Sequence, residues 1–244
     1  MNESLFNAIF HRKSVRSFTD ESLSNETLAQ VIDYAQGVAP LYPDIKIDFA
    51  IENDLPIGLF AVKAPHYLCL YTEKGEGPEH LVNAGYVLQN VDLYLHTRGL
   101  GSCWLGVAKP KVRRIDYRKF LIMLAFGKPQ GALGRSDLDE FKRKPLDQIS
   151  SGDDPRLEAA RLAPSATNAQ NWFFEAVGDN INVYATKLTG AKKRLYGNLT
   201  IIDGGIALCH LMLASKHFDL PFNYQVLPVG AVPKKEGHEY LATI

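Results

Sequence analysis

The stretch NAGYVLQNVDLYLHTRGL, residues 83–100, returns in outline as DGGIALCHLMLASKHFDL, residues 203–220. Both stretches carry small or apolar residues at helical spacing, which predicts a helix in each. The matched faces, each pair 120 residues apart, are Ala84, Leu88, Val91 and Leu95 in the first stretch and Gly204, Leu208, Leu211 and Ser215 in the second. A duplicated chain would fold as two related halves about a pseudo-twofold axis. A shared helix-and-strand order gives the same outline by chance, so periodicity alone leaves both interpretations open.

The segments around the two stretches follow one order. Ala-Pro pairs stand at 39–40 and 163–164, which are 124 residues apart. In each half a helix is expected to end at this pair, and a loop and an aromatic strand follow, IDFAI in the first half and WFFEA in the second. If the duplication is real, each half supplies a different part of one site.

Caps, turns and alternation predict the individual elements. Helices are expected from the N-cap Ser24 to Gly37, along 84–99, over 157–164 after the N-cap Asp154 and the first-turn Pro155, and along 202–221. Strands are expected at 47–52, 65–71, 120–126, 172–177 and 181–185.

The composition is that of a soluble globular protein. The 244 residues are 46% apolar and 22% charged, which allows one large domain or two small fused ones. A net charge of zero argues against nucleic acid as the main partner. Six cations nevertheless cluster in one segment, and we interpret them as a solvated helix face or loop: Lys109, Lys111, Arg113, Arg114, Arg118 and Lys119.

Cysteine use and the opening residues indicate a cytoplasmic protein. Cys69, Cys103 and Cys209 are odd in number and form no CxxC pair, so neither a disulfide framework nor a zinc site is expected. The opening MNESLFNAIFHRK has acidic Glu3 where a signal peptide would be basic. The longest apolar run, 120–126, is too short for a bilayer, which needs about 20 helical residues. We therefore expect no membrane partner.

Residues 11–18, HRKSVRSF, place two arginines and a serine at alternate positions. In an extended segment Arg12, Ser14 and Arg16 share one face. Two guanidinium groups and a hydroxyl suit a phosphate, because guanidinium groups form charge-assisted, often bidentate bonds to phosphate oxygens. A solvated basic turn is the alternative.

Residues 99–106, GLGSCWLG, look at first like a dinucleotide-binding loop. The spacing is GxGxxxxG and a helix precedes it, whereas the dinucleotide fingerprint follows a strand, so we reject that interpretation. The glycines instead allow a ligand to approach main-chain N–H groups around Leu105 and Gly106. A helix C-cap would explain Gly99 but not the other glycines.

Residues 162–174, LAPSATNAQNWFF, place amides and hydroxyls between an apolar helix end and an aromatic strand. Such donors and acceptors can match the edge of a heterocycle, and proline and tryptophan offer flat apolar surface. The residues in question are Ser165, Thr167, Asn168, Gln170 and Asn171, with Pro164 and Trp172. An Asx-rich turn is the alternative.

Taken together, RKSVRSF, NAGYVLQNVDLYLHTRGLGSCWLG, LAFGKP, KRKPLDQI and LAPSATNAQNW resemble the nitroreductase family of FMN-dependent oxidoreductases. The resemblance implies a nitroreductase-like α+β fold, with mixed, largely antiparallel sheets flanked by helices. Family members are homodimers in which an APSxxNxQPW segment, early in the chain, acts across the interface on the partner's flavin.

This sequence departs from the family pattern in two ways. The corresponding segment comes late, at 163–172, and the early position holds APLYPDIKID, without the Ser, Asn and Gln; Asn171 also replaces the family's proline. The second half lacks RxSxR and GLGSCW, and Asp219, Leu220 and Pro221 stand opposite Gly99 to Gly101. The chain therefore resembles the single-chain branch labelled putative TM nitroreductases. The resemblance implies halves 1–150 and 151–244 that imitate the dimer in one chain, with one complete flavin site and no required homo-oligomer.

The resemblance also implies roles for particular residues. The expected FMN contacts are Arg12, Ser14 and Arg16 on the phosphate and ribityl chain, Arg143 completing the phosphate pocket, Leu105 and Gly106 facing the flavin N5, and Pro164, Ser165, Ala166, Asn168 and Gln170 from the other half.

The implied activity is hydride transfer from NAD(P)H through FMN to a nitroaromatic or quinone in ping-pong order, with a small-molecule acceptor and no catalytic side chain or metal. Two alternatives remain open: a flavin-binding protein without turnover, and another flavin reaction on the same scaffold, such as reductive dehalogenation or flavin breakdown. A hydrolase or a metal site is disfavoured, because the motifs GxSxG and HExxH are absent from the sequence. We interpret His210 and His217 as packing residues.

Overall fold

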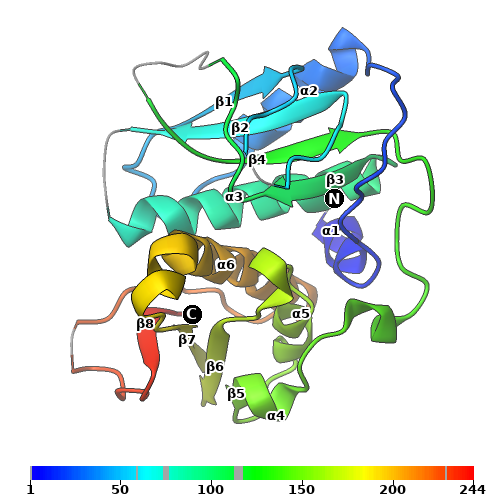
Figure 1. Cartoon of the computed structure of the whole chain (residues 1–244). Helices are drawn as coiled ribbons and strands as arrows, with labels where there is room; N and C mark the ends of the chain where they lie inside the picture. Colours follow the sequence, from blue (N-terminus) through cyan, green and yellow to red (C-terminus); the bar gives the residue numbers. More distant parts are fainter. Residues whose placement is uncertain (1, 59, 74–76, 113–117, 229) are drawn as a thin grey trace.

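Two four-stranded sheets enclose a pair of long helices (Figure 1). The computed structural model describes residues 2–58, 60–73, 77–112, 118–228 and 230–244. From top to bottom in Figure 1 the layers are the first sheet, helix α3 (Pro78–Thr97), helix α6 (Gly190–His217) and the second sheet. The fold is α+β, with two mixed or antiparallel sheets flanked by helices.

The first sheet has the strand order β1-β2-β4-β3 and is antiparallel throughout. The part of the chain that forms this sheet contains, in order, α1 (Asn2–Ile9), α2 (Asn25–Gly37), β1 (Ile47–Glu52), β2 (His66–Thr72), α3, β3 (Gly101–Leu105) and β4 (Lys119–Gly127). Because successive side chains of a strand point to opposite faces of the sheet, the two faces belong to two different hydrophobic cores. Leu68 and Leu70 belong to the main core shared with α3, whereas Tyr67 and Cys69 pack on the opposite face against Val15.

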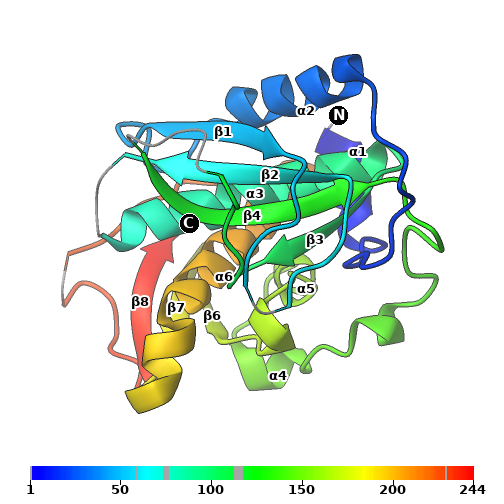
Figure 2. The ribbon, with the colours of Figure 1, turned by 45° about the horizontal axis from the view of Figure 1, so that its top comes forward.

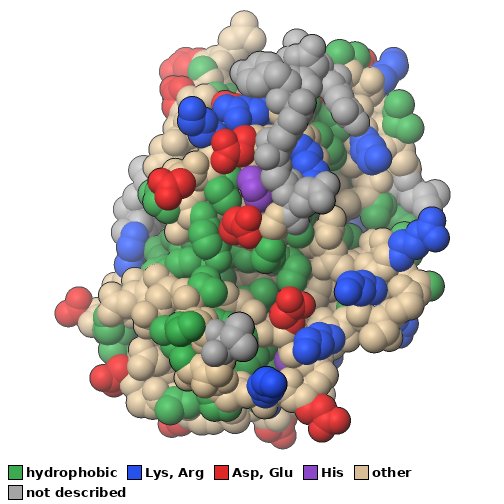
Figure 3. All heavy atoms as spheres, turned by 90° about the vertical axis from the view of Figure 1, so that its left-hand side faces the viewer, with side chains coloured by type: hydrophobic (Ala, Val, Ile, Leu, Met, Phe, Trp, Pro, Cys, Tyr) green, Lys and Arg blue, Asp and Glu red, His purple; other side chains and the backbone are tan. Residues whose placement is uncertain are grey.

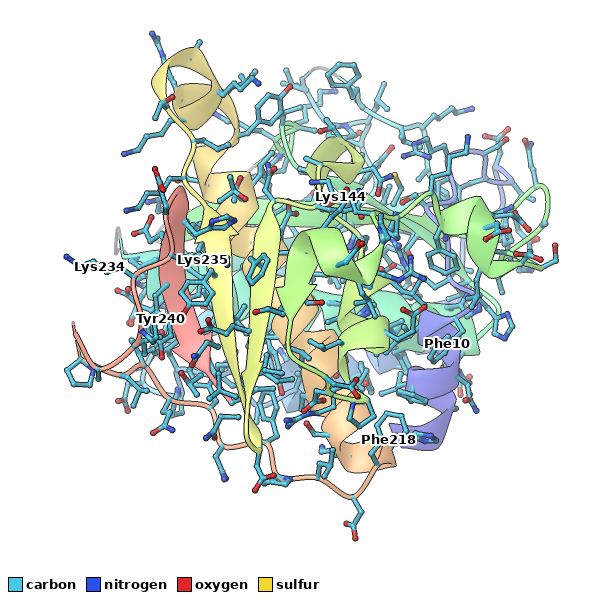
Figure 4. The ribbon with its side chains drawn as sticks, turned by 90° about the horizontal axis from the view of Figure 1, so that it is seen from below. Phe10, Lys144, Phe218, Lys234, Lys235 and Tyr240 are labelled. Carbon is cyan, nitrogen blue, oxygen red and sulfur yellow. The ribbon has the colours of Figure 1, made fainter. Side chains whose placement is uncertain are left out.

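The second sheet has the order β5-β6-β7-β8, and its β5–β6 pair is parallel. Its region contains the 3-10 helix η1 (Leu138–Phe141), α4 (Leu146–Ile149), β5 (Ser150–Ser151), α5 (Leu157–Arg161), the 3-10 helix η2 (Ala166–Asn168), β6 (Trp172–Val177), β7 (Asn180–Thr186), α6 and β8 (His238–Thr243). Figure 4 shows this sheet from below, with Lys235 beside β8; its ammonium lies 3.4 Å from the ring centre of Phe173.

The two halves repeat one strand order. β6, β7 and β8 pair as β1, β2 and β4 do, and an isolated bridge from Gln225 to Thr243 takes the place of β3. A register shift interrupts β2 at Leu70/Tyr71 and β7 at Val183/Tyr184. The chain is internally duplicated, as the family resemblance implied and as periodicity alone left open.

The long helices also end alike. The residues two positions after α3 and α6, Gly99 and Asp219, both have positive φ, at 75° and 55°. The helices cross at two glycines: a Cβ on Gly85 would lie 2.0 Å from the carbonyl oxygen of Ile202, and one on Gly205 would lie 2.2 Å from that of Val82. Each contact corresponds to the other by the shift of 120 residues. Because a Cβ at either position would clash with a main-chain oxygen, the close approach of the helices requires glycine at both positions.

Most predicted elements are confirmed. The hydroxyl of Ser24 caps α2 by accepting from Thr27 N–H at 3.2 Å, and β1, β2, β4, β6 and β7 lie where expected within a residue or two. Three helix predictions were wrong in detail. α3 begins at 78 rather than 84 and ends at 97 rather than 99. α6 begins at 190 rather than 202 and ends at 217 rather than 221. The third is α5, which starts at Leu157 as predicted but ends at Arg161 rather than 164; the Asp154 carboxylate accepts from Arg156 N–H at 2.8 Å and also pairs with the buried Arg156 guanidinium at 2.7 Å. The predicted boundary between halves at 150/151 remains a prediction.

The predicted basic cluster is partly described. Arg118 forms an ion pair with Asp48 at 2.6 Å, while Lys109, Lys111 and Lys119 are exposed. Arg113 and Arg114 lie outside the described residues.

Helix α6 is long and apolar enough to cross a membrane by length and composition. Its most apolar 18-residue window is 78% buried inside the protein, as in the core helix of a soluble protein. Around the helices the surface is mixed: Figure 3, which faces the left-hand side of Figure 1, shows hydrophobic side chains in the middle of that face and charged ones around them.

Candidate functional site

A cavity of about 390 Å³ lies between the two halves. Figure 2 shows β3 beside α6, the two elements that supply much of its wall. The first half contributes Ser14, Arg16, Phe60, Val62, Cys103, Trp104, Leu105, Gly106, Val107 and Ile122, and the second contributes Pro164, Ser165, Ala166, Thr167, Leu195, Tyr196, Leu199, Ile202, Asp203 and Ile206. Most of these side chains are apolar, so the cavity suits a flat, largely apolar ligand with a polar end.

The segment carrying the first motif runs beside β3, because Val15 N–H donates to the carbonyl oxygen of Ser102 at 2.8 Å. Ser14 and the exposed Arg16 line the cavity. Arg12 is turned inward: it is 2% exposed, and its Nε lies 2.5 Å from Oδ2 of Asp92. Its Nη2 still reaches the Ser14 hydroxyl at 3.4 Å. The two arginines of the motif therefore have different surroundings.

Asp92, which sequence reasoning missed, fixes the base of this segment. It is fully buried on α3 and accepts hydrogen bonds from the hydroxyl of Ser102 and, at 3.4 Å, from the indole N–H of Trp104. Together with Arg12, it joins the N-terminal segment to β3. A carboxylate within an apolar helix stretch was the available signal, since buried charges are retained only when they are paired.

Three arginines gather beside this region. The guanidinium carbons of Arg135 and Arg143 lie 4.1 and 5.5 Å from the ring centre of Phe141, and Arg135 donates to the carbonyl oxygen of Arg12. Burial, and then the positive charge of Arg12, lower the pKa of Arg135 to about 10 and that of Arg143 to about 9. Nε of Arg143 is buried without a hydrogen-bond partner in the described structure. The cluster can accept an anion, because added negative charge relieves its mutual repulsion.

The amide side chains of the loop after α5 bind protein atoms rather than the cavity. Asn168 accepts from Arg143, Gln170 Oε1 accepts from Lys144 N–H at 2.7 Å, and Gln170 N–H donates to the Ser165 hydroxyl at 2.9 Å. Thr167, Asn168 and Gln170 have φ between 51° and 57°. These bonds hold a left-handed backbone and match the Asx-turn alternative for this part of the loop.

Asp203 of α6, also missed from the sequence, holds the cavity side of the same loop. Its two carboxyl oxygens lie 3.0 and 3.1 Å from the main-chain nitrogen of Ala166, whose N–H they accept. The residue is 3% exposed, and burial raises its pKa to about 8. Its position in the repeated helix stretch was visible, but its contact with the loop was not.

The predicted histidine roles agree with the structure. His210 Nδ1 lies 2.8 Å from the carbonyl oxygen of Ala159, Gln89 reaches its other ring nitrogen at 3.0 Å, and burial lowers its pKa to about 3. His217 stacks on Phe6 with ring centres 3.9 Å apart. Phe10 and Phe218, labelled in Figure 4, extend this aromatic contact near the end of α6.

The structure divides the predicted site residues into two groups. The residues Ser14, Arg16, Leu105, Gly106, Pro164, Ser165 and Ala166 line one cavity, although they come from three separate segments of the sequence. Arg12, Arg143, Asn168 and Gln170 lie behind that lining, where they bind protein atoms.

The family model described as "Putative TM nitroreductase" matches residues 4–215. A solved structure of a "putative nitroreductase" from Thermotoga maritima is 20% identical, with 98% of this chain and 91% of that chain covered and a TM-score of 0.64. A nitroreductase family protein from Clostridium difficile is 20% identical, with 63% of this chain and 99% of that chain covered and a TM-score of 0.48. A second protein from Clostridium difficile, described as an FMN-dependent nitroreductase, is 18% identical, with 59% of this chain and 98% of that chain covered and a TM-score of 0.45.

Among curated proteins, none matches the chain. The family match, by contrast, runs from α1 to near the end of α6 and so includes both halves of the cavity wall. On the strength of that match, this chain is a member of the putative TM nitroreductase family.

Proposed function

We propose that the protein is an FMN-dependent oxidoreductase that takes hydride from NAD(P)H and reduces an electron-poor acceptor, such as a nitroaromatic or a quinone, in ping-pong order. The observation that carries the proposal is the single cavity walled by Ser14 and Arg16 from one half and by Pro164 to Ala166 from the other. The family match supports it.

The described residues fit the two ends of FMN. Arg16 lines the cavity and suits a phosphate, and Arg12, Arg135 and Arg143 behind the lining add positive charge nearby. The apolar walls suit an isoalloxazine ring, with Pro164 and Leu105 as flat or aliphatic surface. The main chain at Leu105 and Gly106 is the candidate for contacts near N5.

The chemistry supplied by bound FMN is hydride acceptance from NAD(P)H and reduction of the acceptor. The chain's own residues would bind and orient the two substrates in turn and exclude water with the apolar lining. Arg16 and the nearby arginines would stabilise negative charge. We also propose a cytoplasmic location and a monomer in solution, because one chain supplies both sides of the cavity.

The first experiment is a titration of the purified protein with FMN, in which binding is measured by the quenching of flavin fluorescence. We expect binding at micromolar concentration or below and a yellow protein. No binding in that range would overturn the proposed cofactor.

Turnover is tested separately, because a protein can bind FMN without catalysis. The loaded protein should oxidise NADH or NADPH when a quinone or nitroaromatic is added, with parallel double-reciprocal plots as expected for ping-pong exchange. FMN binding without such turnover would instead favour a flavin-binding protein that is not an oxidoreductase.

A further inference from the structure

The pseudo-twofold axis relates two loop-holding contacts. Asn83 of α3 binds the loop after α2: its Oδ1 accepts from Tyr42 N–H at 2.9 Å, and its Nδ2 donates to the Tyr42 carbonyl oxygen at 3.0 Å. Asp203 of α6 binds the loop after α5 at Ala166 N–H. Asn83 and Asp203 are 120 residues apart, and Tyr42 and Ala166 are 124 apart, the two shifts of the duplication.

At this position the fold accommodates a neutral side chain with one acceptor and one donor. A carboxylic acid has the shape of the asparagine amide and offers the same pair, an accepting C=O and a donating O–H. An ionised Asp203 would have two accepting oxygens sharing one N–H, in a place where it is 3% exposed. Such a carboxylate would be poorly compensated.

The donor of Asp203 has no main-chain target equivalent to that of Asn83. The counterpart of the Tyr42 carbonyl is the carbonyl of Ala166, and this oxygen already accepts from the Thr167 hydroxyl at 2.7 Å and from Ala169 N–H at 3.0 Å. Asp203 itself lines the cavity. A proton on its carboxyl group is therefore free to face a ligand.

We propose that Asp203 is a carboxylic acid that donates a hydrogen bond to an acceptor atom of the heterocycle bound in the cavity. This role rests on the proposed function. Asp203 would then be a positioning residue that holds the loop with one oxygen and the ligand with the other. Its raised pKa, about 8, places the loss of that proton within an accessible pH range.

Among the residues that line the cavity, Asp203 is the one whose pKa is placed near 8, whereas the arginines with lowered pKa, Arg135 and Arg143, lie outside the lining and are the same in the wild type and in Asp203→Asn. Arg16 faces the same cavity from the N-terminal segment, and burial raises the pKa of Cys103 on β3. On α3, which packs against α6, burial raises the pKa of Tyr86. Tyr196 lies two turns earlier on α6 itself.

The sign of the pH effect follows from linkage. Because the ligand binds the protonated form, affinity is full well below pH 8 and falls as the pH rises through the pKa of Asp203. Between pH 7 and pH 9 the Kd for FMN should rise roughly tenfold. Asp203→Asn keeps both an acceptor and a donor, as Asn83 does, and its Kd should stay flat across this range.

The test compares the FMN Kd of the wild type and Asp203→Asn from pH 6.5 to 9 by fluorescence quenching, in which ionisation of FMN affects both proteins alike. Parallel curves would overturn the proposal, because they would show that the proton on Asp203 does not contribute to FMN binding. FMN binding by neither protein, even at pH 6.5, would overturn the proposed function itself.

A second measurement does not depend on the variant. Calorimetry of FMN binding to the wild type at pH 8, in buffers with different ionisation enthalpies, should show uptake of about half a proton, because Asp203 is half ionised there whereas Arg143, with a pKa of about 9, is still mostly protonated. Binding without proton uptake would contradict the proposal even if Asp203→Asn failed to fold.

Discussion

Arg12 and Arg16 belong to one short motif but meet different demands. Arg12 is buried and its charge is matched by Asp92, whereas Arg16 is exposed and lines the cavity. Removing one partner of a buried pair leaves a charge without compensation, while removing an exposed arginine does not. The two residues can therefore be separated by experiment.

We expect Arg16→Ala to weaken FMN binding roughly 10- to 150-fold, the value of one charge-assisted hydrogen bond, with little change in melting temperature. Arg12→Ala should also weaken binding, but mainly by destabilising the fold, by about 3–5 kcal/mol. Thermal melting and FMN titration of both variants check this, with Lys13→Ala as the matched control. Equal melting temperatures for Arg12→Ala and Arg16→Ala would contradict the assigned roles.

At the residue scale, the sequence predicted residues that line the cavity better than the buried residues that hold this lining in place. Ser14, Arg16 and Ser165 line one cavity, as a shared site requires. Asp92 and Asp203 were missed because their roles depend on partners 10 or more residues away, which only the packing of the helices reveals. Side-chain pairing across the fold has no local sequence signature.

At the scale of elements, the crossing of α3 and α6 joins the halves. Gly85 and Gly205 bring each helix against a main-chain carbonyl of the other. Rigid backbone cannot yield as a flexible side chain can, so a methyl group at either position must push the helices apart.

We therefore expect Gly85→Ala and Gly205→Ala each to lower the free energy of unfolding by about 1–3 kcal/mol or more. Gly37→Ala is the matched control: a Cβ there meets nothing within 4 Å, so alanine in the last turn of α2 should be neutral or slightly stabilising. Urea denaturation measures all three. Wild-type stability in Gly85→Ala would show that the helices can separate without cost.

Elements with a buried, periodic face were predictable, and those without one were not. β4 lies within two continuous layers of core and matches its prediction closely. The first turns of α6, GAKKRLYGN, are mostly exposed and lack an apolar stripe, so hydrophobic spacing could not show that the helix starts at 190. α5 starts at Leu157 as predicted but ends at Arg161, three residues before the expected end at 164.

For the whole molecule, the duplication raises the question of a second flavin position. The place related to the cavity by the pseudo-twofold axis has Tyr42 where the cavity has Ala166, and Tyr224 where it has Trp104. The two tyrosine rings contact edge to face with centres 5.5 Å apart, and burial raises the pKa of both. Side chains of the chain itself therefore occupy that position.

We predict one FMN per chain and a monomer near 27.1 kDa in solution. One chain already supplies both walls of the cavity, so self-association adds nothing to the site, and the Tyr42–Tyr224 contact closes the related position to a second flavin. Light scattering after size exclusion gives the mass, and titration at protein concentrations well above Kd gives the stoichiometry. Two FMN per chain would mean that the two tyrosines move aside for a ligand. Flavin binding that occurs only in a dimer would mean that one chain does not form a complete site by itself.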